Sequence, residues 1–544
     1  MVRTGAVACF VALVSGAQAI LKHPLPISEL AKQVQSREAL GDLSIRQLDL
    51  QATYPEYNLS TPIDHFHNDS SYEPHSDGTF NLRYWFDAQF YKPGGPVIVL
   101  TGGETSGADR LPFLQKGIAY QLAKATNGVG VILEHRYYGK SIPVSDFSTE
   151  NLRFLTTDQA LADTAYFAKN VKFAGLEDAD LSPEKTPWIA YGGSYAGAFV
   201  AFLRVLYPDV YYGAISSSGV PEAIWDYWEY FTAAAVYGPP ACVETTQKLT
   251  HVIDNILIGK AGTDYVAQLK TAFGLPNVTY DNDFASAING GIYGLQSLNW
   301  DPSQSSNSFF VYCGNVSSDE VLYPATEARR ESVEELLAVA GYQDELETLA
   351  NRFLNYIGYV NLTSVSRCRG SQDACFSTHD SDFYARDDIT QSWRLWQYQV
   401  CTQWGYLQTG SGVPEDQLPL ISRTIDVDYS TIICREAFNL TEPANVEYIN
   451  RLGGFNISYP RLAFIDGEWD PWRAAGVHAI GLPERPNTPE EPFILIDRAV
   501  HHWDENGLFP NERTPELPPP PVVDAQKQIA EFVQGWVQEF TGKC

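Results

Sequence analysis

Short, continuously apolar segments alternate with helical segments in the first half of the chain, and this alternation limits the possible folds more than any other feature. Residues 97–100, 129–133 and 188–191 are apolar runs of strand length, each followed by a turn. Segments 111–126 and 156–174 have helical patterns. Strands that are apolar on both faces and alternate with helices are typical of a parallel sheet covered on both sides. The sequence therefore predicts an α/β protein.

The alternation stops near residue 221 and returns near residue 453. The segment between has helical stretches and few strand-like runs, and it holds six of the cysteines, so we predict a mainly helical insertion over 222–452. Two further apolar strands follow, at 462–465 and 493–496. A last amphipathic helix presents one apolar face, made of Ile529, Phe532, Val533, Trp536, Val537 and Phe540. The α/β domain is thus expected in two parts, 56–221 and 453–544.

The N-terminus has the composition of a secretory signal peptide. Arg3 precedes a short apolar run, and Ala17-Gln18-Ala19 forms an A-x-A cleavage site. We expect a signal peptide at 1–19 and an N-terminal extension at 20–55, against the alternative of a buried N-terminal helix. No later segment reaches the roughly 18 uninterrupted apolar residues of a membrane span. The protein is therefore expected to be exported, to the extracellular space or alternatively to a vacuole or lysosome.

Sequons and charge agree with export and limit the partners. Glycosylation is expected at seven N-x-S/T sequons: Asn58, Asn68, Asn277, Asn315, Asn361, Asn439 and Asn456. The net charge of −29 argues against nucleic acid or an anionic membrane as partner. It suits a protein that works in acidic surroundings, and equally one that is merely soluble. No H-E-x-x-H or phosphate-binding loop is present, so neither a metal nor a cofactor is expected.

The stretch "WIAYGGSYAGAF" resembles a nucleophile elbow, the strand–turn–helix motif G-x-S-x-G of serine hydrolases. Ser194 follows an apolar strand and precedes a small-residue helix start. Gly192 satisfies the first small position, whereas the second holds Ala196. The alternative is a structural turn. If Ser194 is the nucleophile, the backbone N–H of Tyr195 is the first oxyanion donor, and Gly103 of "LTGGETSG" is the candidate for the second.

An acid and a base for this serine are available after the two late strands, in the order Ser, acid, His that α/β-hydrolases use. The first of these strands is followed by "DGEWDPW", which offers Asp466 and Asp470. The second is followed by "DRAVHHWD", which offers the adjacent His501 and His502. His478 lies close to Asp470 in sequence, and we expect it in the following helix. From the residues alone, the choice within each pair stays open.

Five motifs together resemble one peptidase family: "PIDHF", "EHRYYGKS", "TTDQALAD", "GGSYAG" and "DGEWDPW…HHWD". They are similar to those of the lysosomal Pro-Xaa carboxypeptidase family, which includes dipeptidyl peptidase II, the thymus-specific serine protease and fungal acid prolyl endopeptidases. The match extends from about Asp64 to His502. The resemblance implies an α/β-hydrolase domain with a helical cap between nucleophile and acid, and cleavage after proline.

The resemblance also selects residues. It places the catalytic triad on Ser194, Asp470 and His501, so that Asp470 is preferred over Asp466 and His501 over His502. It pairs Cys401 with Cys434. Nearness along the chain alone pairs Cys242 with Cys313 and Cys368 with Cys375. Cys9 leaves with the signal peptide, so Cys544 is the unpaired cysteine.

A proline pocket should be apolar and aromatic. Trp472 follows the acid directly, and the resemblance adds Trp404 and Tyr406 of "CTQWGY", which are equally interpretable as buried core aromatics. Gln403 stands where the family often has Glu, which weakens an aminopeptidase-like interpretation.

The residues and the family resemblance together predict a secreted or vacuolar serine peptidase that hydrolyses peptide bonds after proline by a Ser-His-Asp acyl-enzyme mechanism at acidic pH. Exo- or endopeptidase action and oligomeric state stay open. The alternatives are a lipase or carboxylesterase on the same fold, and a catalytically silent binding protein.

Overall fold

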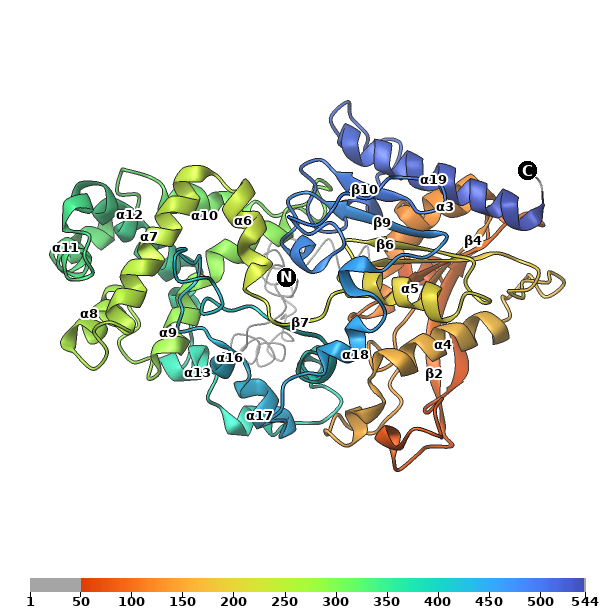
Figure 1. Ribbon diagram of the computed structural model, residues 1–544, viewed down its shortest axis with the longest axis horizontal. Coiled ribbons are helices and arrows are strands. Elements are labelled where there is room, and N and C mark those ends of the chain that lie inside the picture. Colours follow the sequence, from red (N-terminus) through yellow and green to blue (C-terminus); the bar gives the residue numbers. More distant parts are fainter. Residues whose placement is uncertain (1–49, 543–544) are drawn as a thin grey trace, which may run out of the picture.

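A computed structural model describes residues 50–542 of the chain. The predicted signal peptide 1–19, Cys9, most of the extension 20–55 and Cys544 lie outside the described residues. Eight strands form one sheet in the order β1-β2-β4-β3-β5-β6-β9-β10 (Figure 1). β2 is antiparallel to β1 and β4, and the remaining neighbours are parallel. The strand bounds are β1 Tyr57–Pro62, β2 Thr79–Asp87, β3 Val97–Thr101, β4 Val129–Leu133, β5 Trp188–Gly193, β6 Gly213–Ser217, β9 Leu462–Gly467 and β10 Phe493–Ile496.

The central strands are buried along their whole length, as their apolar composition requires. The predicted strands at 97–100, 129–133, 188–191, 462–465 and 493–496 are confirmed as β3, β4, β5, β9 and β10. β6 was not predicted, because its sequence GAISS contains one large apolar residue. A side chain at its first residue, Gly213, would come within 2.7 Å of the Trp536 ring, so tight packing favours small residues there.

Helices cover both faces of the sheet. α4 (Thr157–Asn170) and α5 (Tyr195–Leu206) lie in one core with one face, whereas α3 (Ile118–Thr126) and α19 (Pro520–Thr541) lie in a second core on the other (Figure 1). The predicted apolar face of the last helix is confirmed, since Ile529, Phe532, Val533 and Trp536 are buried. The predicted helix 111–126 is instead two helices, α2 (Leu111–Gln115) and α3. The break is at Gly117, where a Cβ would meet the Glu505 carbonyl oxygen at 2.6 Å.

The segment between β6 and β9 is mainly helical and extends away from the sheet as a separate mass (Figure 1). A two-stranded sheet of β7 (Ile224–Asp226) and β8 (Gly405–Leu407) lies at its base. Its α-helices are α6 Thr232–Tyr237, α7 Pro240–Leu257, α8 Asp264–Ala272, α9 Asp281–Ile288, α10 Ser308–Val316, α11 Arg330–Val339, α12 Leu346–Thr363, α13 Gln372–Phe376, α14 Ser381–Tyr384, α15 Trp393–Gln399, α16 Val427–Ser430, α17 Ile432–Phe438 and α18 Val446–Asn450. The bounds 222 and 452 for this insertion remain a proposal.

Three disulfides staple the insertion: Cys242–Cys313 joins α7 to α10, Cys368–Cys375 closes a short loop, and Cys401–Cys434 connects the segment after α15 to α17. These are the pairs given in the sequence analysis. No helix within residues 50–542 is long and apolar enough to cross a membrane. The strand order, the helices on both faces and the insertion after β6 together make this an α/β-hydrolase fold with a helical cap.

Candidate active site

Ser194 occupies a strained turn between β5 and α5. Its backbone has φ +63° and ψ −128°, a conformation that non-glycine residues rarely adopt. A Cβ at Gly192 would lie 2.0 Å from the Ala196 carbonyl oxygen, so only glycine fits two residues before the serine. Ala196 itself is buried, and its methyl group is accommodated. The alanine therefore meets the same steric requirement as the glycine of the usual motif.

Two backbone segments converge beside Ser194. Tyr195 is the first residue of α5, and the N–H groups of a helix's first turn have no partner within the helix. Gly103, in the loop after β3, has φ +65°, and a Cβ there would lie 3.4 Å from the Ala196 methyl group. The loop after β3 is thus held against the N-terminus of α5. This arrangement brings together the two segments that the sequence named for the oxyanion donors.

A buried hydrogen-bond network fixes the Tyr195 ring through its hydroxyl group. Gln399 Nε2 donates to the Tyr195 hydroxyl over 3.0 Å, and His135 Nε2 lies 3.1 Å from the same oxygen. His135 Nδ1 faces the Arg136 carbonyl oxygen at 2.8 Å, so Nδ1 carries the proton and Nε2 accepts from Tyr195. Burial lowers the pKa of His135 to about 4, which keeps this imidazole neutral. The network fixes the start of α5, and sequence reasoning did not find His135 or Gln399.

Asp470 and His501 form a buried pair. The Asp470 Oδ2 lies 2.8 Å from His501 Nδ1, and Oδ1 accepts the Trp472 N–H over 2.9 Å. Both side chains are buried. His501 Nε2, the nitrogen that faces away from Asp470, is buried and has no hydrogen-bond partner among the described residues. A histidine oriented by a carboxylate with its second nitrogen unused is arranged to accept a proton.

The end of β6 connects the serine turn to the histidine loop. The Ser194 N–H donates to the Ser217 carbonyl oxygen over 2.9 Å, and the His502 N–H donates to Ser218 Oγ over 2.9 Å. A Cβ at Gly193 would lie 3.2 Å from His502 Cγ, so the second histidine packs directly against the residue before Ser194. The loops after β5, β6 and β10 therefore meet at one edge of the sheet.

Asp466 belongs to a second aspartate–histidine pair. Its Oδ2 lies 2.6 Å from His478 Nδ1, and the His478 ring stacks on Phe493 with centroids 3.7 Å apart. The expectation that His478 lies in a helix is wrong, because the short 3-10 helix Pro471–Ala475 ends three residues earlier. Asp466 and Asp470, the two candidate acids, thus have different histidine partners.

Asp504 lies close to the ends of β5 and β6. It belongs to the segment DRAVHHWD, but the sequence analysis assigned it no role. It accepts hydrogen bonds from Ser217 Oγ at 2.5 Å and from the Tyr191 hydroxyl at 2.8 Å. Burial raises the pKa of Asp504 to about 6, and the two hydrogen bonds offset only part of that effect. An acidic residue in the same short motif as two histidines was the signal that could have identified it.

Because the pKa of Asp504 is about 6 in the folded state and 3.8 as a free side chain, the folded protein holds this proton more tightly. Its contribution to stability is present below pH 4 and is lost as pH rises to about 6, a change on the order of 3 kcal/mol. Asp504→Asn mimics the protonated form. The free energy of unfolding of this variant should therefore gain on the wild type between pH 4 and pH 7, as measured by chemical denaturation.

The comparison of variant with wild type isolates Asp504 from His135, whose lowered pKa destabilises the fold as pH falls from 6.5 to about 4. Asp178→Asn, the same change at an exposed aspartate, is the control. Parallel pH curves for Asp504→Asn and the wild type would contradict the assignment.

Aromatic rings gather beside His501. Trp472 stacks on Tyr227 with centroids 5.6 Å apart and meets Tyr230 and Tyr406 edge-on at 5.4 and 5.3 Å. The Trp472 ring lies 6.4 Å from the His501 ring. Two of the predicted pocket residues, Trp472 and Tyr406, are therefore in contact, and Tyr227 and Tyr230 join them without having been predicted.

Trp404 and Gln403 are both buried. Trp404 is completely buried, edge-on to Tyr195 at 5.3 Å and stacked on Phe202, so its ring supports the start of α5. Gln403 Oε1 accepts hydrogen bonds from the backbone N–H and the hydroxyl of Thr157, both at 3.1 Å. The glutamine is thus used to anchor the first turn of α4.

Glu104 follows Gly103 and was not singled out by the sequence. Its Oε2 is buried and has no hydrogen-bond partner among residues 50–542. The loop after β3 thus carries an unpaired polar atom next to Gly103.

Comparison with known proteins identifies the family to which this chain belongs. The family profile described as serine carboxypeptidase S28 matches residues 61–517. A probable extracellular serine carboxypeptidase of Arthroderma benhamiae is 50% identical, over 98% of this chain and 76% of the relative. The serine protease vicPa of Bipolaris victoriae is 30% identical, over 78% of this chain and 81% of the relative. The thymus-specific serine protease of Mus musculus is 25% identical, over 85% of this chain and 84% of the relative.

The matched residues include β2 to β10 and the whole helical insertion, so the similarity extends over the sheet, the cap and the edge where Ser194, Asp470 and His501 lie. The chain belongs to the serine carboxypeptidase S28 family of serine peptidases.

Proposed function

We propose that this protein is a secreted serine peptidase that hydrolyses peptide bonds after proline through an acyl-enzyme on Ser194. The observation that carries the proposal is the Asp470–His501 pair, with its unused Nε2, on loops that meet the strained Ser194 turn. His501 Nε2 takes the Ser194 proton as Oγ attacks the carbonyl carbon. The N–H groups of Tyr195 and Gly103 stabilise the oxyanion. His501 then protonates the leaving amine, and water releases the acyl group by the reverse sequence.

Proline specificity is assigned to the aromatic cluster around Trp472. The proline ring is rigid and apolar and its nitrogen carries no N–H, so a wall of aromatic faces selects it without a hydrogen-bond acceptor. Trp472 is held by its Nε1–H, which donates to Gln296 Oε1 over 2.9 Å, and by the stack on Tyr227. Trp472 comes two residues after Asp470 and its ring lies 6.4 Å from the His501 ring, which supports binding of the residue before the scissile bond beside this cluster.

Replacing Trp472 by alanine should lower kcat/KM for a proline substrate by about 10- to 100-fold, the cost of removing one wall of an apolar pocket. Trp472→Phe keeps an aromatic face and should stay within a few-fold of wild type. Both are measured on a fluorogenic peptide with proline before the scissile bond, with the thermal midpoint of each variant as a check on folding. Equal losses in both variants would contradict a role for the ring face.

Export is supported by several observations that are independent of the site. The three disulfides form in oxidising compartments, and the sequence begins with a predicted signal peptide. Five of the seven sequon asparagines are exposed: Asn58, Asn68, Asn277, Asn439 and Asn456. Asn315 and Asn361 are partly buried, and their side chains are hydrogen-bonded within the cap. The Arthroderma relative is described as extracellular.

Action at acidic pH is supported by charge. A net charge of −29 is self-repulsive at neutral pH, and its magnitude falls as carboxylates are protonated. Asp504 favours the folded state more strongly in acid and His135 opposes this over the same pH range, so the proposal rests on the net charge. A kcat/KM that is higher at pH 5 than at pH 7.5 is the expected result.

A set of four proline-rich peptides tests the reaction: one free at both ends, one with a blocked N-terminus, one with a blocked C-terminus, and one with both ends blocked. Each is digested and the products are identified by mass spectrometry. Loss of cleavage with one block identifies the exopeptidase direction, and cleavage of the doubly blocked peptide identifies an endopeptidase. Hydrolysis of acyl esters without cleavage of any peptide would replace the proposal by a lipase or carboxylesterase.

A further inference from the structure

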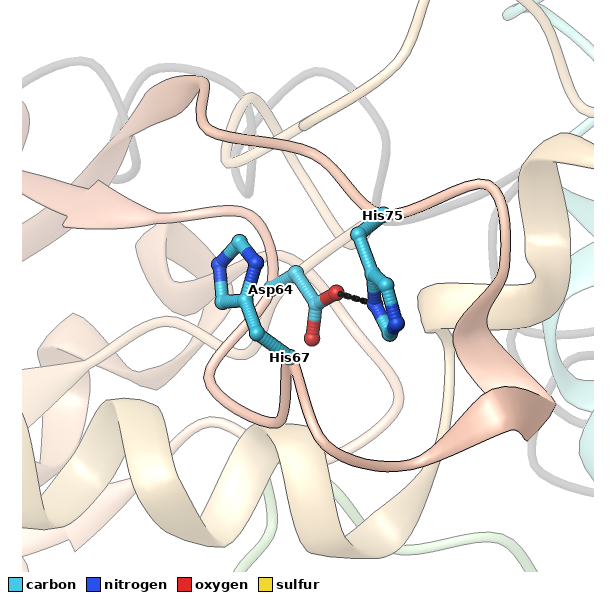
Figure 2. Close-up of side chains that lie close together, drawn as sticks. All are labelled: Asp64, His67 and His75. Carbon is cyan, nitrogen blue, oxygen red and sulfur yellow. Dashed lines mark hydrogen bonds and ion pairs between the residues drawn. The ribbon is translucent and has the colours of Figure 1, made fainter.

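The loop between β1 and β2, residues 63–78, gathers three potential metal ligands at the end of the sheet that β1 forms, with β4 and β3 between β2 and the strand β5 that precedes Ser194. Asp64, His67 and His75 each offer one ligand atom, and these atoms all lie within 4.8 Å of one another. Figure 2 shows the Asp64 carboxylate between the two imidazoles, with His75 on one side and His67 on the other. Two histidines and a carboxylate are a ligand set typical of zinc.

Asp64 is the buried and rigid member of the set. Its Oδ1 accepts the Phe66 N–H and Nε2–H of Gln159, both at 2.8 Å, and Gln159 belongs to α4. Its Oδ2 lies 2.7 Å from His75 Nδ1. Carboxylates that bind metals are usually held by hydrogen bonds of this kind, which fix the direction of the free oxygen. One oxygen of Asp64 is therefore fixed by the protein and the other faces the histidines.

Neighbouring groups of the same chemistry are engaged elsewhere. His65 Nε2 lies 2.7 Å from Asp163 Oδ1, and Asp69 Oδ1 accepts both the N–H and the hydroxyl of Ser71. His67 and His75 instead face each other, with ring centroids 5.4 Å apart. His67 and His75 are thus the two imidazoles of this loop that lie beside the Asp64 carboxylate.

Asp77 can complete the set. Its Oδ1 lies 4.0 Å from His67 Nδ1, and its side chain is fully exposed. A zinc ion binds nitrogen and oxygen at about 2.0–2.2 Å, so its ligand atoms are closer together than the 4.8 Å limit found here. His67 and Asp77 are the exposed members and can move inward, whereas Asp64 stays fixed.

We propose that Asp64, His67 and His75, completed by Asp77, bind one divalent cation of the zinc class. The ion would tie the 63–78 loop to α4 through Asp64 and Gln159. Its expected effect is on the stability of the β1–β2 loop and not on peptide hydrolysis, because β4 and β3 lie between β2 and β5, the strand that precedes Ser194. The site could not be found from the sequence, since His67 and His75 match no zinc-binding spacing and are brought together only by the loop.

The test uses the secreted, chelator-washed protein and zinc chloride at pH 7.5, where free imidazoles are neutral. Isothermal titration should give one zinc ion per chain, and zinc should raise the thermal midpoint. His67→Ala and His75→Ala should each weaken binding by about 100-fold or more and abolish the thermal shift. His379→Ala is the matched control: this exposed histidine stacks on Tyr280 in the cap and should leave zinc binding unchanged.

His67→Ala is the more informative variant, because His67 makes no hydrogen bond to Asp64 whereas His75 does. Absence of stoichiometric zinc binding by the wild type would overturn the proposal. Retained affinity in His67→Ala would do so as well, since it would show that the Asp64–His75 pair only braces the loop or that zinc binds elsewhere. Peptide hydrolysis, measured in parallel without zinc, should be equal in all four proteins.

Discussion

Ser194→Ala should abolish peptide hydrolysis, with a loss in kcat of about 10⁴- to 10⁶-fold and little change in the fold. The Ser194 hydroxyl oxygen is the atom that becomes acylated in the proposed mechanism, and no neighbouring group is proposed to act as the nucleophile in its place. The strained backbone at Ser194, with φ +63°, is set by Gly192 and by the start of α5, so the shorter side chain should be accommodated. The residual rate would come from the oxyanion donors and substrate binding alone.

Active-site labelling by a fluorophosphonate probe gives a second readout, because the probe reacts only with an activated serine. Ser216→Ala is the matched control. Its hydroxyl is buried at the neighbouring strand β6 and has no hydrogen-bond partner among residues 50–542, so its removal should leave labelling and rate unchanged. Labelling that persists in Ser194→Ala would exclude this serine as the nucleophile, and labelling absent from the wild type would favour a catalytically silent protein.

The sheet was predictable where its strands are uniformly large and apolar. β3, β4, β5, β9 and β10 have this composition because helices cover them on both faces. β6 is equally buried but is built from small residues that leave room for Trp536, so it lacks the signal. β1 is a partly exposed edge strand, with alternating burial and a polar sequence. A strand's apolar content thus records the size of its neighbours as well as its burial.

The order of the site residues was predictable for a topological reason. Ser194, Asp470 and His501 each follow one of the parallel strands of a single sheet, and parallel strands end at a common edge. The choice between Asp466 and Asp470 was not determined by that rule, since both follow β9. It depends on which aspartate faces which histidine, a contact between loops that strand patterns do not encode.

The groups beneath the site were beyond sequence reasoning for a similar reason. Asp504 accepts from Tyr191, which lies 313 residues earlier in the chain, and Gln399 reaches Tyr195 across 204 residues. Each of these contacts joins a strand or helix of the first half to the cap or to the last loops. Only the folded sheet brings such residues together.

Two substitutions distinguish the roles of Asp470 and Asp466. Asp470→Asn should lower kcat by about 10⁴-fold with a smaller change in KM, because an amide in place of the carboxylate no longer holds His501 with its proton on Nδ1. The imidazolium that forms as Ser194 attacks would also lose its counter-charge. Asp466→Asn makes the same chemical change four residues earlier, in a residue that is equally buried and equally paired with a histidine.

For Asp466→Asn we expect activity within a few-fold of wild type and a lower thermal midpoint, because the His478 contact braces the loop against Phe493 without reaching His501. Both variants are measured for kcat and KM on one proline substrate and for their thermal midpoints. A structural role for both pairs predicts parallel losses of stability and activity, whereas the proposed triad predicts that only Asp470→Asn loses turnover at full folding. If Asp466→Asn loses turnover instead, the acid of the triad is Asp466, and the Asp470–His501 pair at 2.8 Å serves only to hold the loop.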